Sequence, residues 1–518
     1  MKTLLVTGQM AKGLVERYAK ESGVDFEVLA LALPVAALMN TGYIARELKS
    51  MSVSGYDMIL VPGLSLGDAS VIEKEVGIPT FKGPKYAADL PFVLRYVEEL
   101  QLSKSLPACE VLKGRLAKLS EEELRKLDAD KKLVKKKGNM LVRSLPVGKD
   151  FPMRVMAEIH DVPRRGDDEI RKMAEYFLHN GAEIIDLGMV AGESHPDDAE
   201  RAVRIIRKLT DAPISIDTLD PTEAEAAIKA GADMLLSIDA SNCEEISKFA
   251  THAVVVVIPT DHKRAIFPKK AKDRVELMMR NLKKARELGF QRLVGDLILD
   301  PIHSPSLVES IASYYEFRAR DEDLPLLMGV ANVAELLDAD SVGVNALVAG
   351  IASELKVSIL LTTEVSDKVR GSTSELSTAA KMMYLARRRG SVPKDLGLDL
   401  LRLKEKRLVD EPYDRSIEDE RVIRAEQGPK FDLDPKGCFK ILIDRENEEL
   451  AALHYELGER EPRHIIKGKR ADEVVNSIIK LGLVSRFGHV AYLSSELQKA
   501  ELALRTGRSY VQDKPLFE

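Results

Sequence analysis

The chain has 518 residues, which is too long for one hydrophobic core, so we expect several domains. With 45% hydrophobic and 31% charged residues, its composition is typical of globular proteins. The net charge of −6 gives no reason to expect nucleic acid as a partner, and no apolar stretch approaches the roughly 20 residues of a membrane helix. Three widely separated cysteines argue against a disulfide framework and favour a cytoplasmic location.

Residues 1–118 alternate strand-like and helix-like segments, which predicts a small α/β domain of the Rossmann or flavodoxin type. We expect strands at Thr3–Thr7, Asp57–Val61 and Ile78–Phe81. The glycine turns TGQMAKG and PGLSLGD fit neither the dinucleotide fingerprint nor the P-loop, so we interpret them as structural turns. Residues 119–150 are rich in charge, and we predict a helical connector there.

From Arg154 the alternation of strands and amphipathic helices becomes regular. Eight strands, each followed by a helix, predict a central (β/α)8 TIM barrel over residues 151–400. The expected strands are Val155–Ile159, Ile184–Leu187, Ile214–Asp217, Met234–Ile238, Ala253–Ile258, Leu293–Leu299, Leu326–Val330 and Val357–Thr362.

Residues 401–430 are charged and poor in apolar residues, which predicts an interdomain linker. A small C-terminal α/β domain is expected over 431–518, with a strand at Phe439–Ile443 and a last helix near Ala491–Thr506. The predicted fold class is therefore α/β, a TIM barrel flanked by two small α/β domains.

Three buried strands each end in an aspartate: Asp186 in EIIDLG, Asp217 in ISIDT and Asp300 in LILDP. The C-terminal strand ends of a (β/α)8 barrel carry its active site. A carboxylate at the end of a hydrophobic strand is costly unless a partner uses it. We therefore expect one shared polar pocket. The other polar residues expected at strand ends include Glu158, His160, Ser237, Asp239, Asp261, His262, Asp296, His303 and Asn332.

Carboxylates with few fixed cations nearby suit a neutral or cationic heterocycle that donates N–H groups, because a ring edge can donate two parallel hydrogen bonds to one carboxylate. A metal site that uses His160 or His303 is the alternative, but no metal-ligand spacing supports it. Any one of the aspartates can instead cap the following helix, and Asp217 fits that role best.

In order and spacing, GAEIIDLG, PISIDT, GADMLLSIDAS and LILDP resemble the pterin-binding barrel family, which includes dihydropteroate synthase and methyltransferases that use methyl-tetrahydropterins. The whole chain resembles archaeal dihydropteroate synthase-related proteins. The resemblance implies that Asp186 and Asp300 grip the amino-pyrimidine edge of a reduced pterin and that Asp217 lies beneath the ring. Further pterin contacts would come from Glu158, Ser237, Asp239 and Asn332.

The chain departs from that family at several positions. Leu236 stands where the family usually has an Asn, and Ser237 or Asp239 would replace that contact. The cations that hold a leaving diphosphate in dihydropteroate synthases are missing after strands seven and eight. Lys368 and Arg370 are candidate phosphate contacts if their loop folds back over the barrel.

Asn332, in GVAN, resembles the methyltransferase branch, in which this Asn supports protonation of the pterin nitrogen that carries the methyl group. The alternative is a cap on the helix of residues 333–337. With Asp217, Asn332 is our candidate catalytic residue.

The resemblance implies a transferase of archaeal folate or tetrahydromethanopterin metabolism, which condenses a hydroxymethyl-dihydropterin diphosphate with an arylamine. One alternative is methyl transfer from a methyl-tetrahydropterin to an acceptor, with a corrinoid protein as candidate partner. The other is a non-catalytic pterin-binding protein. We predict a reduced pterin as substrate or cofactor, no metal, and a homo-oligomer, most simply a dimer.

Overall fold

A computed structural model describes residues 2–95, 97, 101–111, 113–394, 396–404, 422–425 and 434–517. The chain forms two compact units, Met1–Glu405 and Lys406–Glu518. Most of the expected linker at 401–430 lies outside the described residues. Within the described part of the chain, none of the helices combines the length and the hydropathy of a membrane-spanning segment.

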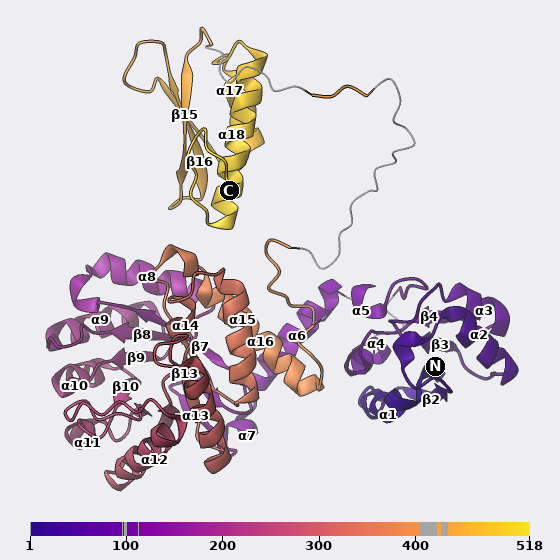
Figure 1. Ribbon diagram of the computed structural model, residues 1–518, viewed down its shortest axis with the longest axis horizontal. Helices are drawn as coiled ribbons and strands as arrows, with labels where there is room; N and C mark the ends of the chain where they lie inside the picture. Colours follow the sequence, from indigo (N-terminus) through magenta and orange to yellow (C-terminus); the bar gives the residue numbers. More distant parts are fainter. Residues whose placement is uncertain are drawn as a thin grey trace. The chain divides into compact units, whose positions relative to one another are not determined.

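The N-terminal part of the first unit is a parallel four-stranded sheet with the order β2-β1-β3-β4 (Figure 1). Its strands are β1 (Lys2–Gly8), β2 (Asp25–Leu31), β3 (Met58–Val61) and β4 (Thr80–Lys82). The sequence prediction missed β2, because the acidic residues of DFEVLAL interrupt its apolar pattern. The accompanying helices are α1 (Lys12–Lys20), α2 (Thr41–Ser50), α3 (Ser70–Val76), α4 (Leu90–Arg95) and α5 (Ala108–Val111).

The connector is helical only in its first part, in α6 (Lys113–Asp128) and α7 (Lys131–Val134). The prediction of a helical connector is wrong for its second part, where β5 (Asn139–Val142) and β6 (Leu145–Gly148) form an antiparallel hairpin. Val142 and Val147 are fully buried among the inward-facing residues of the barrel. Arg154, the first residue of the first barrel strand, donates a hydrogen bond to the Pro146 carbonyl (2.7 Å), so the hairpin closes the N-terminal end of the barrel.

Eight parallel strands form the closed barrel, as the sequence predicts. They are β7 (Arg154–Ile159), β8 (Ile184–Gly188), β9 (Ile214–Asp217), β10 (Met234–Ile238), β11 (Val254–Val257), β12 (Arg292–Asp296), β13 (Leu326–Gly329) and β14 (Ile359–Thr362). Pairing of β14 with β7 completes the ring.

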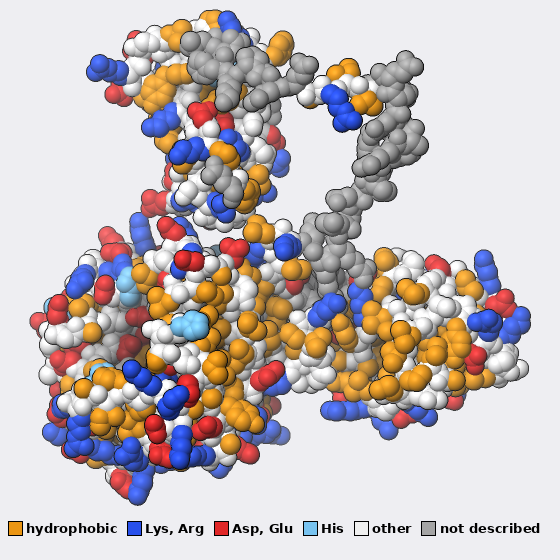
Figure 2. Space-filling model, in the orientation of Figure 1, with side chains coloured by type: hydrophobic (Ala, Val, Ile, Leu, Met, Phe, Trp, Pro, Cys, Tyr) orange, Lys and Arg blue, Asp and Glu red, His pale blue; other side chains and the backbone are white. Residues whose placement is uncertain are grey.

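Helices surround the barrel strands (Figure 1). They are α8 (Asp167–His179), α9 (Pro196–Leu209), α10 (Pro221–Ala230), α11 (Cys243–Ala250), α12 (Ala271–Glu287), α13 (Leu307–Arg320), α14 (Ala331–Ala334), α15 (Ser341–Glu354) and α16 (Ser372–Arg389). Their apolar faces pack on the outward side chains of the strands in one large core. On the visible surface, acidic and basic side chains are interspersed (Figure 2).

The second unit contains an antiparallel sheet in the order β15-β16-β17. Its elements are β15 (Cys438–Asp444), β16 (Glu449–Tyr455), β17 (His464–Gly468), α17 (Ala471–Lys480) and α18 (Phe487–Thr506). One face of the sheet packs on the two helices in a separate apolar core.

Candidate functional site

The barrel interior changes from apolar to acidic along the strands. Met156 on β7 and Ile184 on β8 belong to the inner apolar cluster that the hairpin covers. Because strand side chains alternate between the two faces, Glu158 and Asp186, two residues further on, also face inward. Asp217 on β9 and Asp296 on β12 follow the same alternation. Four carboxyl groups therefore gather at the C-terminal mouth of the barrel.

Asp186 is fully buried at the centre of this group. Its Oδ1 accepts a hydrogen bond from the Ser215 hydroxyl. Its Oδ2 is buried and has no hydrogen-bond partner among the residues described. An unpaired buried carboxyl oxygen is costly, so this atom is suited to accept a hydrogen bond from a bound donor or to carry a proton itself.

Burial and neighbouring carboxylates raise pKa values within this acidic group. Burial raises the pKa of Asp186 well above its usual range, and the charges of Asp217 and Glu158 raise it further. Burial, with the charges of Asp217 and Asp161, raises the pKa of Glu158 to about 7. Burial chiefly raises the pKa of Asp296 to about 6. At neutral pH the group therefore holds protons that it can donate.

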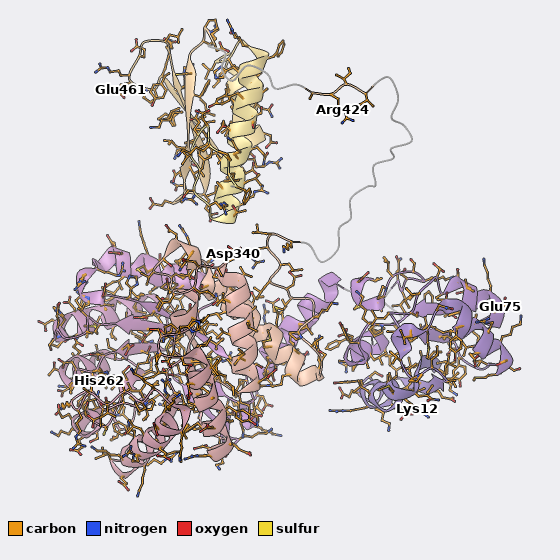
Figure 3. All side chains as sticks on the ribbon, viewed as in Figure 1. Lys12, Glu75, His262, Asp340, Arg424 and Glu461 are labelled. Atoms are coloured by element: carbon orange, nitrogen blue, oxygen red, sulfur yellow. The ribbon has the colours of Figure 1, made fainter. Side chains whose placement is uncertain are left out.

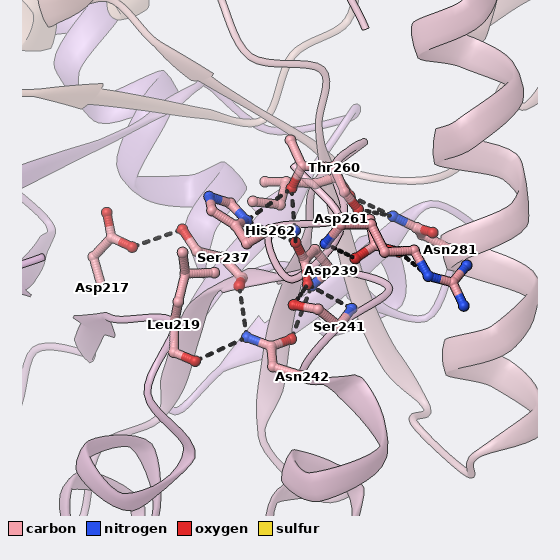
Figure 4. Close-up of polar contacts among 12 residues, drawn as sticks. Asp217, Leu219, Ser237, Asp239, Ser241, Asn242, Thr260, Asp261, His262 and Asn281 are labelled. Atoms are coloured by element: carbon pink, nitrogen blue, oxygen red, sulfur yellow. Dashed lines mark hydrogen bonds and ion pairs between the residues drawn. The ribbon is translucent and has the colours of Figure 1, made fainter. Parts of the chain in front are cut away.

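Asp217 accepts a hydrogen bond from the Ser237 hydroxyl at 2.7 Å (Figure 4). Burial raises the pKa of Asp217, and this hydrogen bond lowers it. Asp217 does not cap the following helix, because Asp220 does so, accepting from the backbone N–H groups of Thr222 and Glu223. The carboxylate of Asp217 is thus available to the barrel mouth.

Leu236 faces the barrel interior and belongs to its apolar cluster. The next residue, Ser237, has φ +69°, and the pairing register of β10 with β11 shifts between Leu235 and Ile238. This irregularity turns the Ser237 hydroxyl toward Asp217. Ser237 therefore supplies the polar group of β10 at the mouth, and its contact with a pterin stays a prediction.

Asp239, predicted as a pterin contact, is engaged within the protein (Figure 4). Its Oδ1 accepts from the N–H and hydroxyl of Ser241. Its Oδ2 accepts from the Thr260 hydroxyl (3.0 Å) and from the backbone N–H (2.8 Å) and Nδ1 (2.7 Å) of His262. Despite burial, these hydrogen bonds keep the pKa of Asp239 below its usual value. The residue joins the loops that follow β10 and β11.

Asp300 is paired with a cation that the sequence did not predict. Nη2 of Arg274, on α12, lies 2.9 Å from Oδ2 of Asp300, and both side chains are buried. Burial raises the pKa of Asp300, while Arg274 lowers it. One oxygen of Asp300 is therefore already occupied by a fixed positive charge.

Asn332 lies at the mouth between β12 and β13, and its amide nitrogen donates to the Leu299 carbonyl (2.9 Å). It is exposed and makes no capping hydrogen bond to α14. The candidate phosphate contacts lie apart from this site. Lys368 pairs with Asp338 at 2.8 Å, and Arg370 lies beside Tyr176 of the outer helix α8.

Besides the pairing of Arg274 with Asp300, two contacts within the site were not predicted from the sequence. Asp296, expected among the strand-end residues, belongs to the acidic group and accepts a hydrogen bond from Tyr314 of α13 (2.6 Å). The contact between Asp239 and His262 joins two strand ends that the sequence showed only separately. Within the described ranges, no group of three or more His, Cys, Asp or Glu side chains is arranged to hold a metal ion.

Three protein families match separate parts of the chain. Residues 163–350 match the family described as pterin binding enzyme. Residues 2–85 match a family of unknown function (DUF6513), and residues 433–513 match the PterinBD-DUF4346 family. The barrel is thus of the class found in pterin-binding enzymes.

An uncharacterized protein of Methanocaldococcus jannaschii is 39% identical over 529 aligned residues, which span 100% of this chain and 99% of that protein. The chain belongs to the same family as this relative, a family of dihydropteroate synthase-related pterin-binding barrels with additional N- and C-terminal domains.

Solved dihydropteroate synthases also align with the barrel. The enzyme of Yersinia pestis is 17% identical with a TM-score of 0.40, over 48% of this chain and 99% of its own. The enzyme of Vibrio fischeri is 19% identical with a TM-score of 0.39, over 48% of this chain and 98% of its own.

Proposed function

We propose that this protein is a transferase that binds a reduced pterin at the C-terminal mouth of the barrel. The observation that carries the proposal is the acidic group of Glu158, Asp186, Asp217 and Asp296. Asp186 offers an unpartnered buried oxygen, and Asp217 faces the mouth beside Ser237. A pterin presents several N–H donors on one edge, and carboxyl groups accept such donors in pairs.

The charged side chains in and around the site favour one reaction, the transfer of a one-carbon group from a pterin nitrogen. A departing diphosphate needs cations where its charge develops. Arg274 is bound to Asp300 and Lys368 to Asp338. In contrast, an amine leaving group needs a proton, and the carboxyl groups with raised pKa values hold protons near neutral pH. Asn332, exposed at the mouth, would orient the pterin nitrogen.

Condensation of a hydroxymethyl-dihydropterin diphosphate with an arylamine is the second candidate. The order of Asp186, Asp217 and Asp300 at barrel strands two, three and six resembles that of dihydropteroate synthases and favours it. Condensation would require Lys368 to leave Asp338, or Arg370 to leave Tyr176, in order to bind the diphosphate. A role in archaeal tetrahydromethanopterin synthesis rests on this second reaction.

Calorimetric titration with a dihydropterin tests the binding proposal. We expect Asp217→Asn to weaken binding at least tenfold, because Asp217 faces the mouth. Asp220→Asn is the matched control: it lies three residues further on, keeps a side chain that can cap α10 and leaves pterin affinity unchanged. Equal affinities of wild type and Asp217→Asn would refute the site.

Turnover then decides the reaction. One mixture holds methyl-tetrahydropterin with a thiol, an amine or cob(I)alamin, and the other holds hydroxymethyl-dihydropterin diphosphate with an arylamine. Asn332→Ala should keep pterin affinity but slow methyl transfer. Pterin binding with no turnover in any mixture would support the non-catalytic alternative.

A further inference from the structure

His262 and Asp239 are in contact at the mouth of the barrel, where the Asp239 side chain is buried and the His262 side chain is partly exposed. The Asp239 side chain is completely buried, whereas the His262 side chain is 35% exposed, and Nδ1 of His262 lies 2.7 Å from Oδ2 of Asp239. The two residues follow adjacent strands, β10 and β11. In Figure 4 the imidazole ring lies on the side of Asp239 that faces Ser237 and Asp217.

The contact determines which ring nitrogen carries the proton. Asp239 accepts hydrogen bonds from four neighbouring groups besides the ring, which keeps its pKa low and its carboxylate ionised. An ionised carboxylate can only accept hydrogen bonds, so Nδ1 of His262 must be the donor. In the neutral ring Nε2 then has a free lone pair and is the basic atom.

The ring is held in position on several sides. It packs edge-on against Phe267, with 5.0 Å between ring centroids and 87° between planes. The loop is closed by backbone hydrogen bonds between Asp261 and Ile266. From α12, the Asn281 amide donates to the carbonyls of Ile258 and Thr260 (2.8 and 3.1 Å). This support fixes the ring without using Nε2.

The charged neighbours of the loop have partners of their own. Lys263 pairs with Glu245 of α11 at 3.1 Å. Arg264 lies 3.8 Å from Asp261 and points into solvent with 79% of its side chain exposed. Strands β9 and β12 contribute the titratable groups Asp217 and Asp296 to the mouth. His262 is labelled on the barrel in Figure 3, and Figure 4 shows it together with Asp217. Asp239 is the group in direct contact with the ring.

We propose that His262 is the general base of the transfer and that the second substrate is a nucleophile that loses a proton as it attacks, an amine or a thiol. This inference rests on the proposed function, since it names the acceptor of the same site. It excludes a corrinoid acceptor, because cob(I)alamin attacks without losing a proton.

Two parts of the mouth exchange protons with the substrates: His262 takes one up, and the acidic group supplies one. The acceptor N–H or S–H gives its proton to Nε2 of His262 while its electron pair forms the new bond to carbon. The bond from that carbon to the pterin nitrogen breaks, and its electron pair stays on that nitrogen. A protonated carboxyl of the acidic group, Glu158 or Asp186, supplies the proton that the nitrogen takes up. In the condensation, the carbon–oxygen bond breaks instead, and diphosphate leaves with the electron pair.

The alternative is that the pair only joins two loops, and one substitution separates these roles. In His262→Asn the amide nitrogen takes the place of Nδ1, so the bond to Asp239 is kept and the base is lost. His179→Asn, on the exposed end of α8, is the matched control.

We expect His262→Asn to lower kcat/KM about 100-fold or more, as is usual for loss of a general base, with unchanged pterin affinity and melting temperature. The acidic limb of the wild-type pH–rate profile should disappear in this variant and persist in His179→Asn. A nitrogen-15 NMR spectrum of the whole protein should show the Nδ1–H tautomer of His262.

Three results would overturn the inference: an Nε2–H tautomer, a His262→Asn variant that keeps wild-type turnover and acidic limb, or turnover with cob(I)alamin but with no amine or thiol. Failure of the dihydropterin titration would instead refute the proposed function. If the protein binds a pterin but turns over no acceptor, this result counts against both the proposed transferase activity and the role of His262 as general base.

Discussion

The hydroxyl of Ser237 donates to Oδ1 of Asp217 at 2.7 Å and so links the ends of two neighbouring barrel strands. Ser237 reaches Asp217 because its backbone has a positive φ of 69° at an irregularity in β10. A non-glycine residue in this conformation is strained, and such residues concentrate at functional sites. The contact keeps the pKa of Asp217 lower than burial alone would.

Ser237→Ala should therefore raise the pKa of Asp217 and weaken dihydropterin binding about fivefold, because a hydrogen bond to a charged group is lost. The carbon-13 shift of the Asp217 carboxyl, followed against pH, and calorimetry measure the two effects. Ser241→Ala is the control, since its hydroxyl donates to Asp239 instead. An unchanged Asp217 titration would show that the hydrogen bond has no influence.

Stability should fall as pH rises from about 4 to 8. The pKa of Glu158 is raised from 4.5 to about 7 in the folded protein, so between these values the folded state binds more protons than the unfolded chain. Its free energy of unfolding then decreases with increasing pH. Glu158→Gln should flatten this dependence and raise the free energy of unfolding at pH 8 by about 3 kcal/mol. Urea unfolding at pH 5 and pH 8 checks this, and an equal slope in the variant would contradict it.

Asp186→Asn should chiefly weaken pterin binding, whereas Asp300→Asn should chiefly lower stability. Asp186 has no fixed cation as partner among the described residues, so its replacement should weaken pterin binding at least tenfold and leave stability intact. Asp300 neutralises Arg274, so its replacement leaves a buried charge unpaired and should cost about 3–5 kcal/mol of stability. Thermal unfolding and calorimetry of both variants separate the two roles, and an equally stable Asp300→Asn would refute the pairing.

The hairpin β5–β6 should stabilise the barrel from its N-terminal end. Val147 is fully buried, so Val147→Ala should lower the free energy of unfolding by about 1–2 kcal/mol. Leu141→Ala, on the same hairpin but 42% exposed, should change it by less than about 0.5 kcal/mol. Denaturant unfolding compares the two, and equal losses would mean that the hairpin does not pack as described.

The local pattern of apolar and polar residues along the chain predicted the barrel correctly. Apolar runs with helices between them were sufficient for all eight strands, because each buried strand must be apolar and each crossover needs a helix. The local pattern does not predict the hairpin at 139–148, since its burial depends on the barrel end that it covers and not on its own periodicity.

For the site, the apolar runs were sufficient to place Asp186 and Asp217 in barrel strands, because the pattern of buried positions is a local property of each strand. The predicted sixth strand is shorter in the structure, so Asp300 lies in the loop beyond β12. The surroundings of these carboxyl groups follow from how the strands and helices come together in space. Asp186 and Asp217 join Glu158 and Asp296, Asp300 meets Arg274, and Asp239 binds His262. Charge and hydrogen bonding depend on which groups lie within a few ångströms in space, and closure of the barrel determines those distances.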